Sequence, residues 1–219
     1  FDSNWPLDTV KAMTIDQKIA FWRGVMEYAR DRGVDVALFT WNTFVYGTEA
    51  SAYGITDSLD NPTTKDYVRK SVRTLFNTYP LLTAIGITSG ENMGDQNSGT
   101  AVKEQWLWDT YGLGVKDAME DAQNPAGPYY RPGRVIRLIH RAHQSNLNDI
   151  VTLFRQLPGY DAPDSTLSFS FKYSQAHMHS STQPLFIHQN RWFDSIPPGK
   201  TTWLTVRNDD MYYMRWGDP

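Results

Sequence analysis

The chain has 219 residues, 40% of them hydrophobic, and a formal net charge of −3, which fits one sizeable core in a single α/β domain. It has no basic run that would favour nucleic acid and no apolar stretch long enough for a membrane, so we expect neither partner. The absence of cysteine excludes disulfides and thiolate chemistry without fixing a compartment.

The first predicted helix follows a stretch, residues 1–6, that resembles the end of a strand and the loop after it. Thr14 and Gln17 match a capping box, with Thr at the cap and Gln three residues on. Helical spacing then predicts an apolar stripe made of Ile15, Ile19, Trp22, Val25 and Met26. We expect the helix to end near Gly33, because glycine suits a C-terminal cap.

A strand is predicted over 34–41, and a loop rich in Gly, Ser, Thr and Asp follows over 46–62. Loops of that length in compact domains are usually functional or mobile. Thr63 or Thr64 is expected to cap the next helix, which Pro80 stops. The apolar stripe of that helix consists of Tyr67, Val68, Val72, Leu75 and Phe76.

The next apolar run, over 83–89, is partly β-branched and ends at Gly90, after which come the carboxylate Glu91 and Asn92. This pattern predicts a short buried strand, and the glycine lets the backbone leave it sharply. If the strand belongs to an α/β barrel, Glu91 lies on the rim where the active sites of barrels form.

The rest of the chain continues to alternate helices and strands. A helix is predicted from about residue 102 to 121, with an inward face formed by Trp106, Leu107, Val115 and Met119. The remaining predicted elements are a loop over 123–133, strands over 134–140, 166–173 and 201–206, and helices over 147–157 and 186–193.

Five strands that alternate with helical segments predict a parallel sheet with right-handed crossovers, which fits a barrel or a doubly wound sheet. We favour a (β/α)8 barrel of the TIM type, because polar and aromatic side chains follow every strand, whereas a doubly wound sheet gathers its site at one crevice. Those side chains are Trp41 and Asn42; Glu91 and Asn92; His140, Arg141 and His143; Lys172, Tyr173 and His177; and Arg207, Asn208, Asp209 and Asp210. The chain has no GxGxxG motif and no P-loop, and we expect no cofactor.

The predicted barrel is incomplete. With the strand end at residues 1–4, six strands are present, and no helix follows the last one. We therefore expect residues 1–219 to form a single partial barrel, from about strand two to strand seven. The chain begins at Phe1 rather than Met, and we expect the missing strands in a longer parent protein. Exposed sheet edges of such a segment would favour oligomers.

Paired carboxylates give the strongest indication of chemistry. In this register Glu91 ends strand four, and Asp209 and Asp210 follow strand seven, which is where many barrel glycosidases carry their two carboxylates. Glycoside hydrolysis needs one protonated acid at the leaving oxygen and one carboxylate that acts as nucleophile or activates water. Alternatively, Glu91 caps a helix or pairs with an arginine, and the two aspartates bind backbone amides.

Three cations follow strands on the same rim: Arg141, Lys172 and Arg207. Because arginine grips a carboxylate with two parallel hydrogen bonds, these cations suggest an anionic sugar such as a uronate. They could equally form ion pairs with Glu91 and the two aspartates.

Four histidines, His140, His143, His177 and His179, also come after adjacent strands. Neutral imidazoles together with an aspartate could hold a metal. The alternative roles are hydrogen bonds to substrate or a satisfied buried ring, and we expect His140 and His177 to line the rim pocket without a metal.

Five sequence motifs at the predicted strand ends resemble those of a known protein family. They are FTWN at 39–42, GITSGENM at 86–93, RLIHR at 137–141, FKYSQAHM at 171–178 and VRNDDMYYMRWGDP at 206–219. In arrangement the chain resembles barrel glycoside hydrolases of the alpha-glucuronidase-like kind. It departs from them in the placement of the base carboxylate and in the missing strands.

The resemblance implies a TIM-barrel catalytic domain that attacks acidic or decorated polysaccharides from an end, in the periplasm or outside the cell. It implies Glu91 as the general acid, Asp209 or Asp210 as the base, and inversion at the sugar. The substrate-binding residues would be Trp41, Asn42, Asn92, His140, Arg141, His143, Lys172, Tyr173, His177, Arg207 and Asn208. Two other classes stay open: a metal-dependent barrel hydrolase that uses the histidines, and a barrel that binds glycans without cleaving them.

Overall fold

The computed structural model describes residues 12–41, 48–90, 93, 98–142, 145–172 and 195–205. Its centre is a sheet of five parallel strands that lie in the order of the sequence. The strands are β1 (Val36–Phe39), β2 (Leu82–Thr88), β3 (Arg137–Arg141), β4 (Leu167–Lys172) and β5 (Thr202–Thr205). The predicted strands, their parallel pairing and their consecutive order are therefore confirmed, and the described sheet is open rather than closed.

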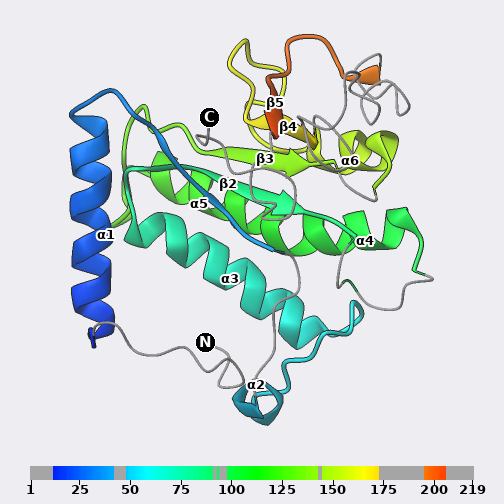
Figure 1. Ribbon diagram of the computed structural model, residues 1–219, viewed down its shortest axis with the longest axis horizontal. Coiled ribbons are helices and arrows are strands. Elements are labelled where there is room, and N and C mark those ends of the chain that lie inside the picture. Colours follow the sequence, from blue (N-terminus) through cyan, green and yellow to red (C-terminus); the bar gives the residue numbers. More distant parts are fainter. Residues whose placement is uncertain are drawn as a thin grey trace, which may run out of the picture.

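The helices of the described residues are α1 (Ile15–Arg30), α2 (Thr48–Ala52), α3 (Pro62–Thr78), α4 (Thr100–Leu107), the π-helical turn η1 (Trp108–Gly112), α5 (Leu113–Gln123) and α6 (Leu147–Phe154). Figure 1 shows α3 running beside the long rod made of α4, η1 and α5, while α1 stands at the edge of the molecule. Each described helix is too short or too polar to traverse a lipid bilayer. The predicted elements at 1–6 and 186–193 lie outside the described residues.

Consecutive order in a parallel sheet has a consequence for the layers. Right-handed crossovers between strands that neighbour each other in both sequence and space carry every connecting helix to the same face. A doubly wound sheet instead reverses its strand order and has helices on both faces. The described strands show no such reversal, so the described connecting helices lie on one face of the sheet, which we call the packed face. The opposite face carries none of these described helices, and we call it the open face.

The packed face holds the core. Ile85 and Ile87 of β2 and Phe169 of β4 are fully buried there, against helices that contribute Phe76 and Val115. The predicted inward face of the long helix is confirmed, since all four of its residues are buried: Trp106, Leu107, Val115 and Met119. Burying an aliphatic or aromatic side chain of this size stabilises the fold by roughly 1.5–3 kcal/mol.

The long helix is not regular. The predicted single helix is interrupted at η1, where a π-helical turn inserts an extra residue between α4 and α5. This lets the apolar faces of both α4 and α5 point to the sheet. Gly112 closes the turn, and a Cβ there would stand 2.4 Å from Cε3 of Trp108, so a larger residue would displace the indole ring.

The ends of α3 differ from expectation at one point. Its N-cap is Asn61, whose side chain accepts hydrogen bonds from the backbone of Thr63 and Thr64, and Pro62 occupies the first turn. The prediction that Thr63 or Thr64 is the cap was wrong, because Asn61 precedes a proline that already suits the first helical position. The predicted stripe also included Tyr67, which is exposed.

The C-terminal end of α3 is held by a cation from a distant segment. Nη2 of Arg134 donates to the carbonyl oxygens of Phe76 and Tyr79, at 3.0 Å each, and Arg23 of α1 donates to Thr78 O at 2.9 Å. Cations favour the negative end of a helix dipole. Burial lowers the pKa of Arg134 to about 10, which still leaves it charged at neutral pH.

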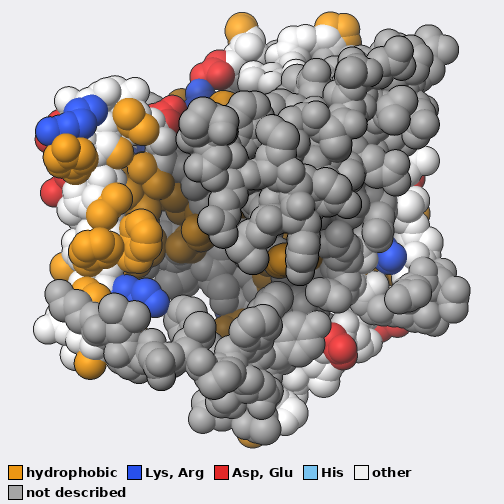
Figure 2. Space-filling model, viewed as in Figure 1, with side chains coloured by type: hydrophobic (Ala, Val, Ile, Leu, Met, Phe, Trp, Pro, Cys, Tyr) orange, Lys and Arg blue, Asp and Glu red, His pale blue; other side chains and the backbone are white. Residues whose placement is uncertain are grey.

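Helix α1 begins with the predicted capping box, in which Thr14 and Gln17 bond reciprocally. Its apolar stripe is only partly used: Met26 is buried, whereas Ile15 and Trp22 are 78% and 43% exposed. The predicted stripe therefore lies on a helix, but only its Met26 is buried among the described residues. The helix stands at the edge of the molecule, and Figure 2 shows hydrophobic side chains gathered on that side.

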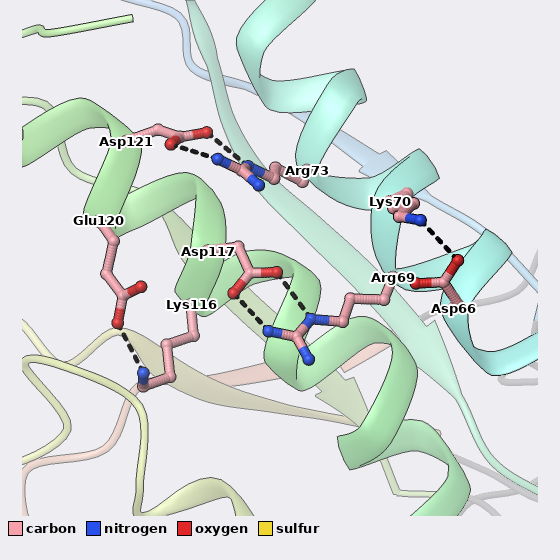
Figure 3. Close-up of polar contacts among 8 residues, drawn as sticks. All are labelled: Asp66, Arg69, Lys70, Arg73, Lys116, Asp117, Glu120 and Asp121. Carbon is pink, nitrogen blue, oxygen red and sulfur yellow. Dashed lines mark hydrogen bonds and ion pairs between the residues drawn. The ribbon is translucent and has the colours of Figure 1, made fainter. Parts of the chain in front are cut away.

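A ladder of ion pairs fixes α3 against the long helix (Figure 3). Arg69 binds Asp117 with two hydrogen bonds of 2.7 and 2.8 Å, and Arg73 binds Asp121 with two of 2.7 Å. Lys65, one turn earlier on α3, contacts Asp109 at 2.9 Å. Because the cations are four residues apart, the ladder sets the sliding register of the two helices.

We expect Asp121→Asn to lower the free energy of unfolding by about 1 kcal/mol at neutral pH, since it weakens charge-assisted bonds from Arg73. The Arg73 hydrogen bonds hold the pKa of Asp121 below its ordinary value of 3.8. Such a carboxyl stabilises the folded state above the unfolded-state pKa, and this stability is lost as the pH falls through the lower, folded-state pKa. Urea unfolding at pH 7 and pH 3 measures the difference, which should be smaller in the variant.

Asp66→Asn is the matched control. Its carboxylate pairs with Lys70 one turn along the same exposed helix face, and such pairs contribute little. Equal pH dependence in Asp121→Asn and the unchanged protein would contradict the role given to the ladder.

Candidate functional site

The open face of the sheet forms a hollow of about 950 Å³, which we call the sheet hollow. It runs along the strands from their N-terminal ends to their C-terminal ends. The residues that line it are Asp35, Ala37, Phe39, Thr40, Trp41, Thr83, Ala84, Thr88, Arg137, Ile139, Arg141, Asp164, Ser165, Ser168, Ser170, Thr201 and Trp203.

The floor of the sheet hollow is made by small side chains. Successive residues of a strand point to opposite faces, so Ala84 and Thr88 of β2 face the hollow while Ile85 and Ile87 face the helices. In the same way, Ser168 and Ser170 of β4 alternate with Leu167, Phe169 and Phe171 on the packed face. Small polar residues on one face and large apolar ones on the other leave room for a ligand on the open side.

One glycine makes room for an aromatic ring. Gly86 of β2 is paired with Phe39 at the end of β1, and a Cβ on Gly86 would stand 2.2 Å from Cδ1 of Phe39. The ring of Phe39 therefore lies directly over the bare backbone of Gly86. The phenyl ring of Phe39 thus lines part of the sheet hollow.

Three aromatic side chains of the sheet hollow are open to solvent. Phe39, Trp41 and Trp203 are 54%, 46% and 51% exposed. The indole Nε1 of Trp203 donates to Ser168 Oγ at 3.1 Å, which fixes the orientation of that ring on β5. Exposed, oriented rings at the two edges of a concave surface are suited to stacking against the apolar faces of planar or cyclic ligands.

Charged residues lie at both ends of the sheet hollow. Arg137, at the start of β3, forms an ion pair with Asp164, and Asp35 precedes β1 at the same end. Arg141, at the end of β3, lines the opposite end, where the strands terminate. Arg141 and Trp41 thus both line the sheet hollow at the C-terminal ends of their strands, β3 and β1.

The C-terminal end of β1 is tied to the helix layer. The hydroxyl of Tyr111, from the π-helical turn, donates to the carbonyl oxygen of Trp41 at 3.1 Å. Burial raises the pKa of Tyr111 to about 12, and the hydrogen bond with Thr40 opposes this only in part. The hydroxyl of Tyr111 is therefore protonated at neutral pH and able to donate a hydrogen bond.

His140 lies on the other side of the sheet. Its Nε2 is 2.7 Å from Oε2 of Glu104 on α4, both side chains are fully buried, and Phe154 of α6 packs edge-on against the imidazole. His140 is not among the residues that line the sheet hollow. The expectation that it lines the rim pocket is corrected: strand parity turns Arg137, Ile139 and Arg141 to the hollow and His140 to the helices.

Most of the predicted site lies outside the described residues. This holds for Asn42, Glu91, Asn92, His143, Tyr173, His177, His179, Arg207, Asn208, Asp209 and Asp210. Lys172 is the last residue of β4, and the structure describes its backbone only. Within the described ranges, the acidic and histidine side chains form no group that could hold a metal ion.

Sequence reasoning missed several residues that the structure brings to the site. Arg137, Ser168 and Trp203 could have been found from strand parity, by asking which residues share a face with Arg141. The Gly86 contact with Phe39 joins two strands, and the pair of Glu104 with His140 joins a helix to a strand. No local pattern in the sequence signals such contacts.

Comparison of the chain with protein-family models, with curated proteins and with solved structures finds no match.

The contact of Phe39 with Gly86 can be tested with a double-mutant cycle. Gly86→Ala forces the phenyl ring out of its rotamer, and we expect a loss of roughly 1 kcal/mol in the free energy of unfolding. In a Phe39→Ala background the same change should cost much less, because the three atoms nearest to the new Cβ belong to the ring of Phe39. The expected coupling is thus about 1 kcal/mol, measured by chemical denaturation.

Gly24→Ala is the matched control for this cycle, since a Cβ at this position in α1 meets nothing within 4 Å. We expect it to stabilise the fold by roughly 0.5–1 kcal/mol, as helical glycine to alanine changes do. Additive effects of Gly86→Ala and Phe39→Ala would show that the ring does not lie over Gly86.

The buried pair of Glu104 and His140 generates a second prediction. Glu104→Ala leaves a buried imidazole without its partner, and we expect it to lower the free energy of unfolding by roughly 3–5 kcal/mol. The double variant Glu104→Leu/His140→Leu replaces both polar groups and should regain most of that loss. Guanidinium unfolding of the three proteins measures this, and a single variant as stable as the original would refute the pairing.

Proposed function

We propose that this chain is the larger part of a TIM-barrel glycoside hydrolase that acts on acidic or decorated polysaccharides or oligosaccharides. The observation that carries the proposal is the sheet hollow, which combines exposed aromatic rings with arginine side chains on the open face of a consecutive parallel sheet. The proposal includes secretion or periplasmic residence, as the resemblance implies, and association through exposed sheet edges.

The barrel part of the proposal is supported by topology. Consecutive parallel strands, whose described connecting helices α3, α4, α5 and α6 pack on one another in one layer, are the arrangement from which a (β/α)8 barrel is built. In a closed barrel the open face would become the interior, and the C-terminal rim would carry the site. Among the described residues, β1 is an edge strand and α1 has an exposed apolar face, which leaves both able to pack against a further strand and helix.

The sugar-binding part is supported by the chemistry of the sheet hollow. Trp41 and Trp203 offer flat apolar faces at its two edges, and serine and threonine hydroxyls lie between them. Arg141 lies among these groups at the C-terminal end, where a guanidinium suits the carboxylate of a uronate. Aromatic faces, hydroxyls and a guanidinium together match an acidic sugar better than a purely apolar ligand.

The catalytic part is supported by sequence position. Glu91 follows β2 and the aspartates Asp209 and Asp210 follow β5, so both sets come after strands that end on the same edge. Flat strands spaced 4.7–4.9 Å apart would separate β2 from β5 by about 14 Å. Inverting glycosidases hold their carboxyl groups about 6.5–9.5 Å apart, so the mechanism requires the curvature of a barrel or loops that reach inward.

The metal-dependent alternative loses one member of its histidine set, since His140 is engaged by Glu104 beneath the sheet. The glycan-binding alternative requires the sheet hollow alone and no carboxylates. Turnover and its sensitivity to a metal chelator together therefore separate the three classes.

The test is a panel of uronate-bearing and neutral oligosaccharides, with hydrolysis followed by release of sugar and binding by calorimetry. We expect preferential hydrolysis of acidic substrates that survives a metal chelator. Glu91→Gln should lower turnover by roughly two to four orders of magnitude, the usual contribution of general acid catalysis, and leave folding and binding intact. Trp203→Ala should instead weaken binding about tenfold, as the loss of a stacking ring does.

Each other outcome contradicts the proposal in a distinct way. Binding without hydrolysis would favour the glycan-binding barrel, and chelator-sensitive hydrolysis would favour the metal enzyme. Turnover unchanged in a folded Glu91→Gln protein, on a substrate with a poor leaving group, would remove Glu91 from the mechanism.

A further inference from the structure

We propose that Tyr111 is the positioning residue for the β1 side of the sheet hollow: its hydroxyl fixes the backbone at Trp41 and so sets the aromatic edge that a ligand meets. The identity of that ligand as a sugar rests on the proposed function. The positioning itself rests only on contacts among described residues.

The first observation is the hydrogen bond from the helix layer to the rim. Tyr111 is buried, and its hydroxyl donates to Trp41 O at 3.1 Å across seventy positions of sequence. Its ring packs edge-on against Trp106, with centroids 6.3 Å apart, and Trp106 is itself buried. The donor therefore comes from a fixed point of the core and reaches the last described residue of the segment that ends β1.

The second observation is the set of described backbone contacts that hold the end of β1. β1 has four residues and is an edge strand of the described sheet, in which it pairs with β2. Its last ladder bond runs from Thr40 N to Gly86 O at 2.9 Å. One residue beyond, the Trp41 carbonyl accepts from Tyr111 and from the Thr40 hydroxyl, both at 3.1 Å. Since Phe39 and Trp41 are about half exposed, these backbone hydrogen bonds contribute to holding them in place.

The third observation is the irregularity that supplies the donor. Tyr111 belongs to η1, and π-helical turns occur mostly as single-turn insertions that are frequent at functional sites. One residue fewer would rotate Tyr111 by about 100° relative to α5 and turn its hydroxyl away from β1. Trp108 and Gly112 fit together within this turn, so the sequence maintains it.

The experiment compares Tyr111→Phe with the original protein by hydrogen–deuterium exchange without ligand. The variant keeps the ring and removes only the hydroxyl. We expect the peptide that contains Thr40 and Trp41 to exchange roughly three- to tenfold faster, the factor that corresponds to one typical hydrogen bond, while exchange in α3 and α5 is unchanged. Tyr160→Phe is the control, because Tyr160 is buried to a similar degree and lies away from β1.

The second readout compares the change in KM with the change in kcat for Tyr111→Phe on the oligosaccharide panel. A positioning role predicts a KM, or a dissociation constant, raised about three- to tenfold with kcat nearly unchanged, because binding geometry is lost and the reacting groups are not touched. Unchanged exchange at Thr40 and Trp41 would overturn the inference. Faster exchange throughout the helix layer would do so as well, since Tyr111 would then be a core residue only. If no sugar binds to the original protein, the proposed function fails, and the exchange experiment still decides the role of Tyr111.

Discussion

Successive side chains of a strand point to opposite faces of the sheet, so every strand needs residues that suit the helix layer to alternate with residues that suit the open face. In β2 the residues Ile85 and Ile87 pack beneath the helices, whereas Ala84 and Thr88 lie on the open side. In β3 the same rule turns His140 into the core and Arg141 into the hollow. The residues that pack against the helix layer and the residues that line the sheet hollow therefore alternate along each strand. A shift of one residue in the register of any strand would move each of its side chains to the other face.

The two faces are not independent, because the helix layer reaches the rim of the hollow. The ion pairs between α3 and α5 fix how far the long helix slides along its neighbour. The π-helical turn within that helix then aims Tyr111 at the end of β1, where its hydroxyl holds the carbonyl of Trp41. A chain of contacts thus leads from surface charges through the core to an exposed aromatic edge, and it gives a rigid support to a short edge strand.

The sequence predicted the elements better than their surroundings. The strands, their order and the capping box at Thr14 follow from local patterns that the structure confirms. The predicted stripe of α1 is exposed at Ile15 and Trp22, because periodicity marks which residues share a face and does not say whether another element covers it. His140 was assigned to the rim because it ends a strand, yet its partner Glu104 lies 36 positions away on a helix, and no spacing rule connects the two.

By itself the sequence determined the alternation of strand and helix, the parallel consecutive sheet and the polar residues at the strand ends, since propensity, capping and crossover handedness act over short stretches of chain. Only the tertiary structure decided which face of each strand is open, that Gly86 makes room for Phe39, and that Tyr111 reaches Trp41. These outcomes depend on pairing register and on the packing of segments far apart in the chain. Such packing is fixed by the shapes of both partners together, and neither partner's local sequence records it.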